Sequence, residues 1–206
     1  MAIRQIKSGK AAGTDNIPKI WEEEQVLMDW KEGHLIKIPK KDLSTCENYR
    51  GITLLSIPGK VFNRVLLNRM KDAVDAQLRD QQAGFRKDRS CTDRITTLRI
   101  MVEQSIEWNS SLYTNFIDYE KAFDSVGRRT LWKLLRHYEV PEKIVNITRN
   151  SYDGLQCKVV YRGQLTDAFQ VSTGNRQGCL LSPFLFLFVV DWIMKTSTSE
   201  GKHGVQ

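Results

Sequence analysis

FIDYEKAFDSV, residues 116–126, decides the fold that this sequence predicts. The run 112–117 before Asp118 is rich in residues that favour strands, and the EKAF segment after it favours a helical turn. The pattern therefore predicts Asp118 at the end of a β-strand. A half-buried carboxylate there needs a cation, a hydrogen-bond donor or a proton. Asp118 is accordingly either a metal ligand or a cap on the next turn.

The composition is that of a folded, basic protein. The chain has 206 residues, of which 41% are hydrophobic and 27% charged, and its net charge is +7. Such a charge favours an acidic partner, most commonly nucleic acid. No lipidation signal or basic amphipathic helix favours a membrane. The longest apolar run, residues 184–194, is too short to span a bilayer, and no secretory signal is visible, so we expect an intracellular protein.

Two basic strands are predicted near the start of the chain. HLIKIPKK (34–41) and NYRGITLLS (48–56) both have strand-like patterns. Together they predict a hairpin that presents Lys37, Lys40 and Arg50 to an anion, or else a charged hairpin that faces only solvent. The four cysteines lie far apart, which predicts free thiols and neither a zinc site nor a disulfide framework.

Helices and one basic loop follow. Apolar residues three and four apart predict amphipathic helices over 59–78 and 92–108. Between them, the loop QQAGFRKDRS combines the aromatic Phe85 with several cations. Such a loop suits stacking and phosphate contacts with a nucleic-acid strand, although a run of charges is more often a solvated surface.

The second half of the chain predicts a helix over 130–140, another from Pro141, and a hairpin of strands 158–161 and 168–172. The loop STGNRQGCLLSP (172–183) then leads into an apolar helix. Its two glycines frame Arg176 and Gln177, and a glycine loop before a helix permits close approach by a ligand.

Four motifs, NYRGITLLS, QQAGFRKDRS, FIDYEKAFDSV and GNRQGCLLSP, occur in this order. Together they resemble the successive motifs of the reverse transcriptases of non-LTR retrotransposons, the jockey-like and related mobile elements. The resemblance implies an α+β right-hand polymerase fold, with fingers over 1–94 and an incomplete palm over 95–206. The hairpin around Arg162 would reach back to the fingers. The implied activity is RNA-directed DNA synthesis from dNTPs, on an RNA template and a DNA primer, with Mg²⁺ or Mn²⁺.

The resemblance also implies three groups of site residues. The metal would be held by Asp118, with the backbone carbonyl of Tyr119 beside it. The nucleotide would be bound by residues of both parts of the fold, namely Lys37, Lys40, Arg50, Phe123, Gln177 and Gly178. The template would be guided by one loop, through Gln82, Gly84, Phe85 and Arg86.

The sequence departs from the family pattern in several places. No Asp-Asp pair occurs, so we expect a chain truncated before that palm motif, with an internal deletion near residues 18–19. Asp124 and Asp191 are expected to be structural. Arg128 and Asn175 stand where acidic and apolar character, respectively, is more usual. Two other hypotheses therefore stay open: a catalytically inactive remnant that still binds nucleic acid, and a structural protein with scattered surface cations.

Overall fold

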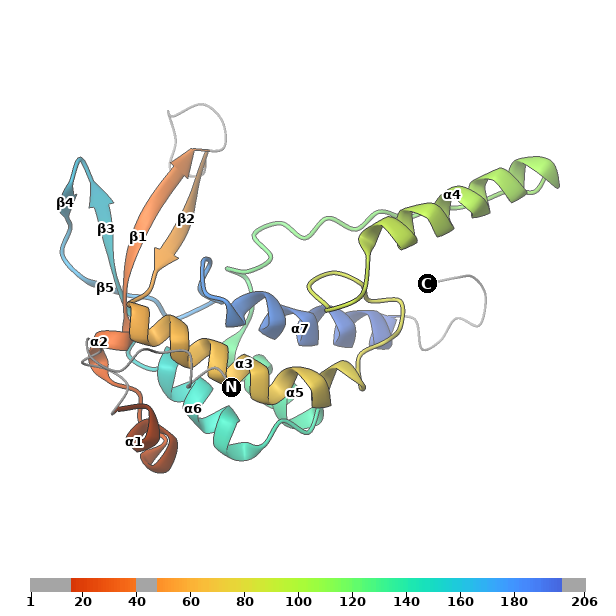
Figure 1. Ribbon diagram of the computed structural model, residues 1–206. Coiled ribbons are helices and arrows are strands. Elements are labelled where there is room, and N and C mark those ends of the chain that lie inside the picture. The colour runs from red at the N-terminus through yellow and green to blue at the C-terminus, as the bar shows by residue number, and fades with distance from the viewer. Residues whose placement is uncertain (1–15, 40–47, 198–206) are drawn as a thin grey trace.

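The computed structural model describes residues 16–39 and 48–197, which form an α+β structure as predicted (Figure 1). The helices are α1 (Asn16–Glu23), α2 (Met28–Lys31), α3 (Ile57–Asp75), α4 (Cys91–Glu107), α5 (Arg128–His137), α6 (Glu142–Tyr152) and α7 (Leu181–Ser197). The strands are β1 (Glu32–Pro39), β2 (Tyr49–Leu54), β3 (Gln156–Tyr161), β4 (Gln164–Leu165) and β5 (Phe169–Gln170).

One sheet joins the two halves of the chain. Strands β1 and β2 form an antiparallel hairpin, and β3 lies parallel to β1, from Glu32 opposite Gln156 to Leu35 opposite Val159. Strands β4 and β5 both pair with β3 in the antiparallel sense. The hairpin around Arg162 was expected to reach back to the fingers, and its strand β3 does pair with β1, which lies within residues 1–94.

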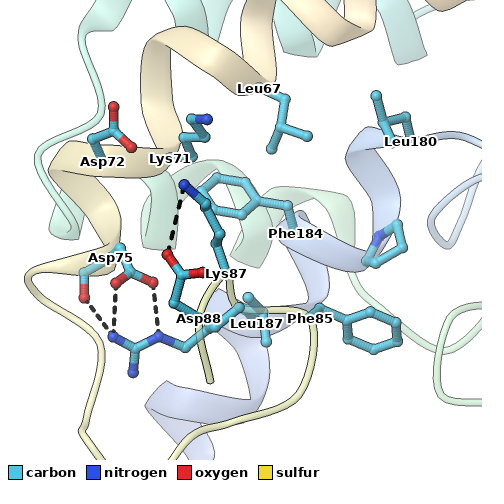
Figure 2. Close-up of a pocket in the computed structure, with 12 residues that line it drawn as sticks. Leu67, Lys71, Asp72, Asp75, Phe85, Lys87, Asp88, Leu180, Phe184 and Leu187 are labelled. Atoms are coloured by element: carbon cyan, nitrogen blue, oxygen red, sulfur yellow. Dashed lines mark hydrogen bonds and ion pairs between the residues drawn. The ribbon is translucent and has the colours of Figure 1, made fainter. Parts of the chain in front are cut away.

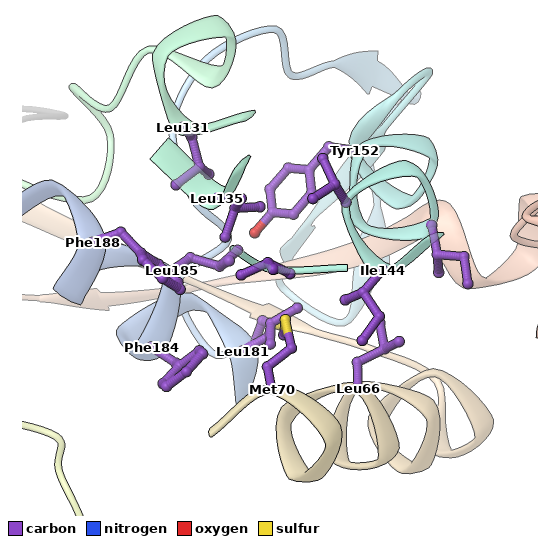
Figure 3. Close-up of a cluster of buried hydrophobic side chains, with 14 of the residues drawn as sticks. Leu66, Met70, Leu131, Leu135, Ile144, Tyr152, Leu181, Phe184, Leu185 and Phe188 are labelled. Atoms are coloured by element: carbon purple, nitrogen blue, oxygen red, sulfur yellow. The ribbon is translucent and has the colours of Figure 1, made fainter. Parts of the chain in front are cut away.

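The hydrophobic core lies among the helices. Figure 3 shows Leu66 and Met70 of α3 facing the side chains of α7, with α5 and α6 closing the other side. The apolar stripe predicted for α3 is buried, because helical residues three and four apart share one face. Each such side chain stabilises the fold by about 1.5–3 kcal/mol. Ser56 caps the start of α3 by accepting a hydrogen bond from the Gly59 amide (3.3 Å).

The chain between α4 and α5 differs from the prediction. The helix over 92–108 is confirmed as α4, but none of its residues is buried, and it projects from the rest of the molecule (Figure 1). The strand predicted over 112–117 is wrong: residues 110–119 have no regular structure, and Phe116 is 84% exposed. A strand needs a neighbour for its backbone hydrogen bonds, and no strand in the described part of the chain lies beside this segment.

Two further predictions concern cysteines and membranes. Cys91, Cys157 and Cys179 are free thiols, as predicted, whereas Cys46 lies outside the described residues. Among the described helices, none combines the length and apolar character that crossing a bilayer requires.

Candidate functional site

Two distant parts of the chain meet at the loop over residues 173–178. The Gln177 carbonyl accepts a hydrogen bond from the Thr53 amide of β2 (2.7 Å). On the other side, the Asn175 amide donates to the Phe123 carbonyl (2.7 Å). The loop thus links β2 to the turn that follows FIDYEKA, so that three of the four motifs lie side by side.

Two glycines make this close packing possible. Gly178 has a positive φ of 93°, and a Cβ atom there would lie 2.6 Å from the Thr53 carbonyl oxygen and 2.8 Å from Ile52 Cγ2. Gly174 has a φ of 73°, and its Cβ would lie 2.8 Å from Asp124 Cα. Both the conformation and the space exclude larger residues. Gly174 and Gly178 were predicted to permit close approach by a ligand, and in the fold they also permit close packing of the chain.

The side chains around this loop form a mixed polar and aromatic surface. Gln177 Nε2 lies 3.4 and 3.5 Å from the two carboxylate oxygens of Asp124. Phe123 stacks on Phe186 of α7, with ring centroids 4.9 Å apart. The loop thus joins the backbone of Phe123 to the segment of Gln177 and Gly178, and Asp124 lies beside Gln177. A shared role of these residues in nucleotide binding stays a prediction.

The register of β1 and β2 separates the two predicted basic residues of the hairpin. Arg50 pairs with Ile38, whereas Lys37 pairs with Gly51. Because paired residues share a face and successive residues alternate, Lys37 and Arg50 lie on opposite faces of the sheet. Lys37 lies over the ring of Tyr161, 4.5 Å from its centroid. The predicted joint anion site of Lys37 and Arg50 is therefore wrong.

Arg50 lies on the same face as Ile52, the residue that contacts Gly178, so its placement agrees with the nucleotide site. It is exposed, and no ion pair is present for it among residues 16–39 and 48–197. Lys40, the alternative basic companion, lies outside the described residues.

Asp118 lies in the exposed segment after α4, so the half-buried strand end that was expected for it is wrong. With Tyr119 and Glu120 it lines a cavity of about 360 Å³, whose apolar wall comes from Phe186 and Val189 of α7. Water can solvate this carboxylate, so burial alone gives it no need of a cation. The described residues contain no cluster of three or more His, Cys, Asp or Glu side chains that could hold a metal ion.

Arg86 is buried and has a structural role, which corrects its prediction as a template contact. Its guanidinium donates to both carboxylate oxygens of Asp75 (2.7 and 3.0 Å) and to the carbonyls of Arg79 (2.7 Å) and Gln82 (3.1 Å). The hydrogen bonds from Arg86 lower the pKa of Asp75, and those to Asp75 raise the pKa of Arg86. The donors that were expected to bind phosphate are used inside the protein.

The Arg86 anchor holds the neighbouring Phe85 at the surface. Phe85 has a φ of +58°, which is rare for a residue with a side chain, and the residue is 66% exposed. It lies at the rim of a cavity of about 520 Å³ between α3 and α7, whose apolar walls include Leu67 and Phe184 (Figure 2). Gln82 and Gly84 belong to the same loop and are half-buried.

The predicted basic and acidic residues therefore do not share one groove. Lys37 and Arg50 lie on opposite faces of the sheet, Arg86 is buried, and Asp118 lines a different cavity from Gln177. This dispersal is what the hypothesis of a structural protein predicted for the cations. The smaller group that does lie together is Gln177 with Asp124 and Gly178 with β2.

A buried cluster around Asp191 was not predicted in any detail. Asp191 has no exposed surface, and its carboxylate accepts hydrogen bonds from Arg79 (3.0 Å from the amide), Tyr138 (2.5 Å) and Lys195 (2.8 Å). Burial opposes its ionisation, yet the hydrogen bonds from Lys195, Tyr138 and Arg79 keep the pKa of Asp191 below its ordinary value. The sequence signal was the Lys four residues after an Asp in an apolar helix.

Comparison with known proteins gives a consistent result. Residues 38–203 match the family described as "Reverse transcriptase (RNA-dependent DNA polymerase)". The chain is 29% identical over 154 residues to the "Retrovirus-related Pol polyprotein from type-2 retrotransposable element R2DM" of Drosophila melanogaster, covering 75% of this chain and 14% of that protein. It is 25% identical over 188 residues to the "RNA-directed DNA polymerase from mobile element jockey" of the same organism, covering 89% and 19%. The chain thus spans less than a quarter of the length of these relatives.

Proposed function

Because the chain belongs to the reverse transcriptase family, we propose that it forms the nucleotide- and template-binding part of an RNA-directed DNA polymerase of a non-LTR retrotransposon. The proposed fold is the right hand, with fingers over 1–94 and part of the palm over 95–206. One observation carries the proposal: the loop 173–178 is hydrogen-bonded to β2 on one side and to the turn after Asp118 on the other. Three motifs of the family thereby border one surface.

The nucleotide would bind on this surface. Arg50 is exposed on the face of β2 that Gly178 contacts, and its planar guanidinium suits a triphosphate. Phe123, held against Phe186, would lie under the incoming sugar and exclude a 2′-hydroxyl. Gln177 and the backbone of Gly178 would contact the nucleotide and the template base. Lys37 is left out of this group because it faces the other side of the sheet.

The described residues do not by themselves fit a metal centre. Asp118 offers one accessible carboxylate, and the Tyr119 carbonyl is a further oxygen donor of the kind that Mg²⁺ or Mn²⁺ prefers. Nowhere in the described ranges do three His, Cys, Asp or Glu side chains lie close enough together to hold a metal ion. Asp118 stays our candidate for a single ligand, and we derive no catalytic step through a metal ion.

The template strand would pass the loop that carries Phe85. The exposed ring is suited to stack on an unpaired base, which is commonly worth about 1–3 kcal/mol. The buried Arg86 would act indirectly, by holding the turn in which Phe85 adopts its positive φ. Gln82 and Gly84 complete this loop.

Nucleotide binding and primer extension test the proposal. We expect dTTP to bind in the presence of a poly-A template and oligo-dT primer, and Arg50→Ala to weaken that binding, whereas Arg149→Ala, an exposed residue of α6, should leave it unchanged. Extension above an Asp118→Ala control would support polymerase activity in this chain. Equal binding by the Arg50 and Arg149 variants would overturn the proposed nucleotide site.

Salt dependence separates a nucleic-acid-binding surface from scattered cations. Affinity for an RNA–DNA hybrid should fall by about 0.7–0.9 log units for each phosphate contact per tenfold rise in salt. Phe85→Ala should weaken binding without changing that slope, because a ring contributes no ion release. Salt-dependent hybrid binding without any extension would instead favour the inactive remnant. Absence of binding at low salt would contradict both hypotheses.

A further inference from the structure

The loop 173–178 is held partly by its own side chains, since the buried Arg176 donates to the backbone carbonyls of Trp30 (3.5 Å) and Ser151. It has no helix or strand, and the amide nitrogen and oxygen of the Asn175 side chain are buried without a hydrogen-bond partner in the described structure. A buried amide with no partner costs free energy. Contacts from other parts of the chain add to those of Arg176 in offsetting this cost and fixing the loop.

Arg128, the first residue of α5, contacts the first two residues of the loop. Its Nε donates to the Gly174 carbonyl (3.3 Å) and its Nη2 to the Thr173 carbonyl (3.1 Å). The remaining Nη1 donates to the carbonyl of Tyr152 at the end of α6 (3.1 Å), and the guanidinium lies 5.1 Å from the centroid of the Tyr152 ring. One side chain thereby ties the start of the loop to a helix of the core.

The shape of the guanidinium explains why arginine suits this position. Three carbonyls from two segments are bonded by three different nitrogens of one planar group, which a lysine ammonium cannot reproduce. Arg128 is half-buried, and this burial lowers the pKa of its guanidinium from the ordinary value, with the nearby charge of Arg176 acting in the same direction. Arg128 therefore makes specific hydrogen bonds with the surrounding backbone and does not act only as a charge at the surface.

The other end of the loop carries Gln177, which the proposed function assigns to the nucleotide site. Gln177 lies three residues beyond Gly174, where its side chain meets Asp124 and its carbonyl meets β2. We propose that Arg128 is a positioning residue, which fixes the loop 173–178 and so holds Gln177 between Asp124 and β2. Its consequence for nucleotide binding rests on the proposed function, but the positioning itself does not.

Amide hydrogen exchange on the full chain tests the positioning directly. The amides of Thr53 and Asn175 report on the loop, because both are bonded across it. In Arg128→Met we expect both amides to exchange at least about tenfold faster relative to the core amides of α7, since hydrogen bonds from a charged group are lost. Arg128→Lys should give an intermediate change, and it also covers the case in which Arg128→Met fails to fold. Arg129→Met, at the exposed neighbour, should change nothing.

Two results would overturn the proposal. The Thr53 and Asn175 amides could keep their wild-type exchange rates, or they could accelerate only in parallel with the α7 amides, as a general loss of stability would produce. A second readout is the side-chain amide signal of Gln177, which should shift in Arg128→Met but not in Arg129→Met. If the wild-type chain fails to bind dTTP while these local changes occur, the proposed function fails and the positioning role stands. If dTTP binds equally to wild type and Arg128→Met while the local changes occur, the consequence for nucleotide binding is refuted and the positioning role stands.

Discussion

Helices α4 and α7 have the same length, 17 residues, and opposite environments. The buried residues of α7 include Leu181, Leu185 and Phe188, and the helix packs against α3 and α5. No residue of α4 is buried, although Ile95, Val102 and Ile106 follow a helical period. The apolar residues form a helix in both cases, as a stripe in α4 and on nearly all sides of α7. Burial requires, in addition, a surface for the stripe to cover.

The largest expected effect is in α7. Phe188 is fully buried against Tyr138 and Phe184, so Phe188→Ala should lower the free energy of unfolding by about 3–5 kcal/mol. Ile106→Ala in α4, whose side chain is 75% exposed, is the matched control and should cost less than about 0.5 kcal/mol. Urea unfolding of both variants measures the difference. Similar losses in the two helices would mean that α4 is packed in solution and would break the comparison.

The polar contacts of α7 give the next effect. Asp191→Asn should cost about 2–3 kcal/mol, because it leaves Arg79 and Lys195 without their carboxylate partner. We place the value below that of a fully buried pair, since the Lys195 side chain is 36% exposed. Lys71→Met, an exchange of a lysine on α3 that has no hydrogen bond to Asp191, should have a much smaller effect.

The same carboxylate predicts a pH dependence. The folded state lowers the pKa of Asp191, so its contribution to stability is present above the unfolded value, about 3.9, and is lost as the pH falls through the lower folded pKa. Asp75 adds a weaker contribution of the same sign, discounted because its side chain is 43% exposed. Unfolding at pH 7 and at pH 3 measures both. Between these pH values, Asp191→Asn should lose less free energy of unfolding than wild type. An equal loss in both proteins would mean that other groups cause the pH dependence.

Asn175 shows the opposite mismatch to α4. Its polar side chain is buried without a hydrogen-bond partner among the described residues, whereas the apolar side chains of α4 are exposed. Asn175→Val should therefore raise the free energy of unfolding by about 1 kcal/mol. Asn150→Val is the control of opposite sign, since the Asn150 side chain accepts a hydrogen bond from the Val26 amide (2.7 Å). Thermal unfolding distinguishes them. A destabilised Asn175→Val would indicate that a bound water satisfies the amide.

Local patterns account for what the sequence predicted correctly. The stripe of α3 and the strands β1, β2 and β3 follow from residue spacing. These features depend on neighbours in the chain. They needed no knowledge of which residues lie opposite one another. The contact of Gln177 and Gly178 with β2 was not predicted.

The wrong predictions all depended on such pairings. Lys37 and Arg50 were separated by the register of two strands, which neither strand specifies alone. Arg86 is buried because Asp75, in the preceding helix, lies within reach of its guanidinium. The strand before Asp118 had the correct residue types but no strand beside it among the described residues. In each case the residue types favoured a local structure or role, but the segment that lies opposite in the fold determined the observed one.

The smallest expected effect tests the exposed face of α4 itself. Replacing Ile95 and Val102 together with serine should leave the free energy of unfolding within about 0.5 kcal/mol of wild type, because both side chains are exposed and serine has a helix propensity close to theirs. Binding of an apolar fluorescent dye should fall in the same variant, since exposed apolar patches bind such dyes. Gln104→Ser, on the same helix, controls for the exchange to serine. A loss of stability above about 1 kcal/mol would show that this face is covered in solution. Helices α4 and α7 would then both be buried, and they would differ only in the surface that covers them.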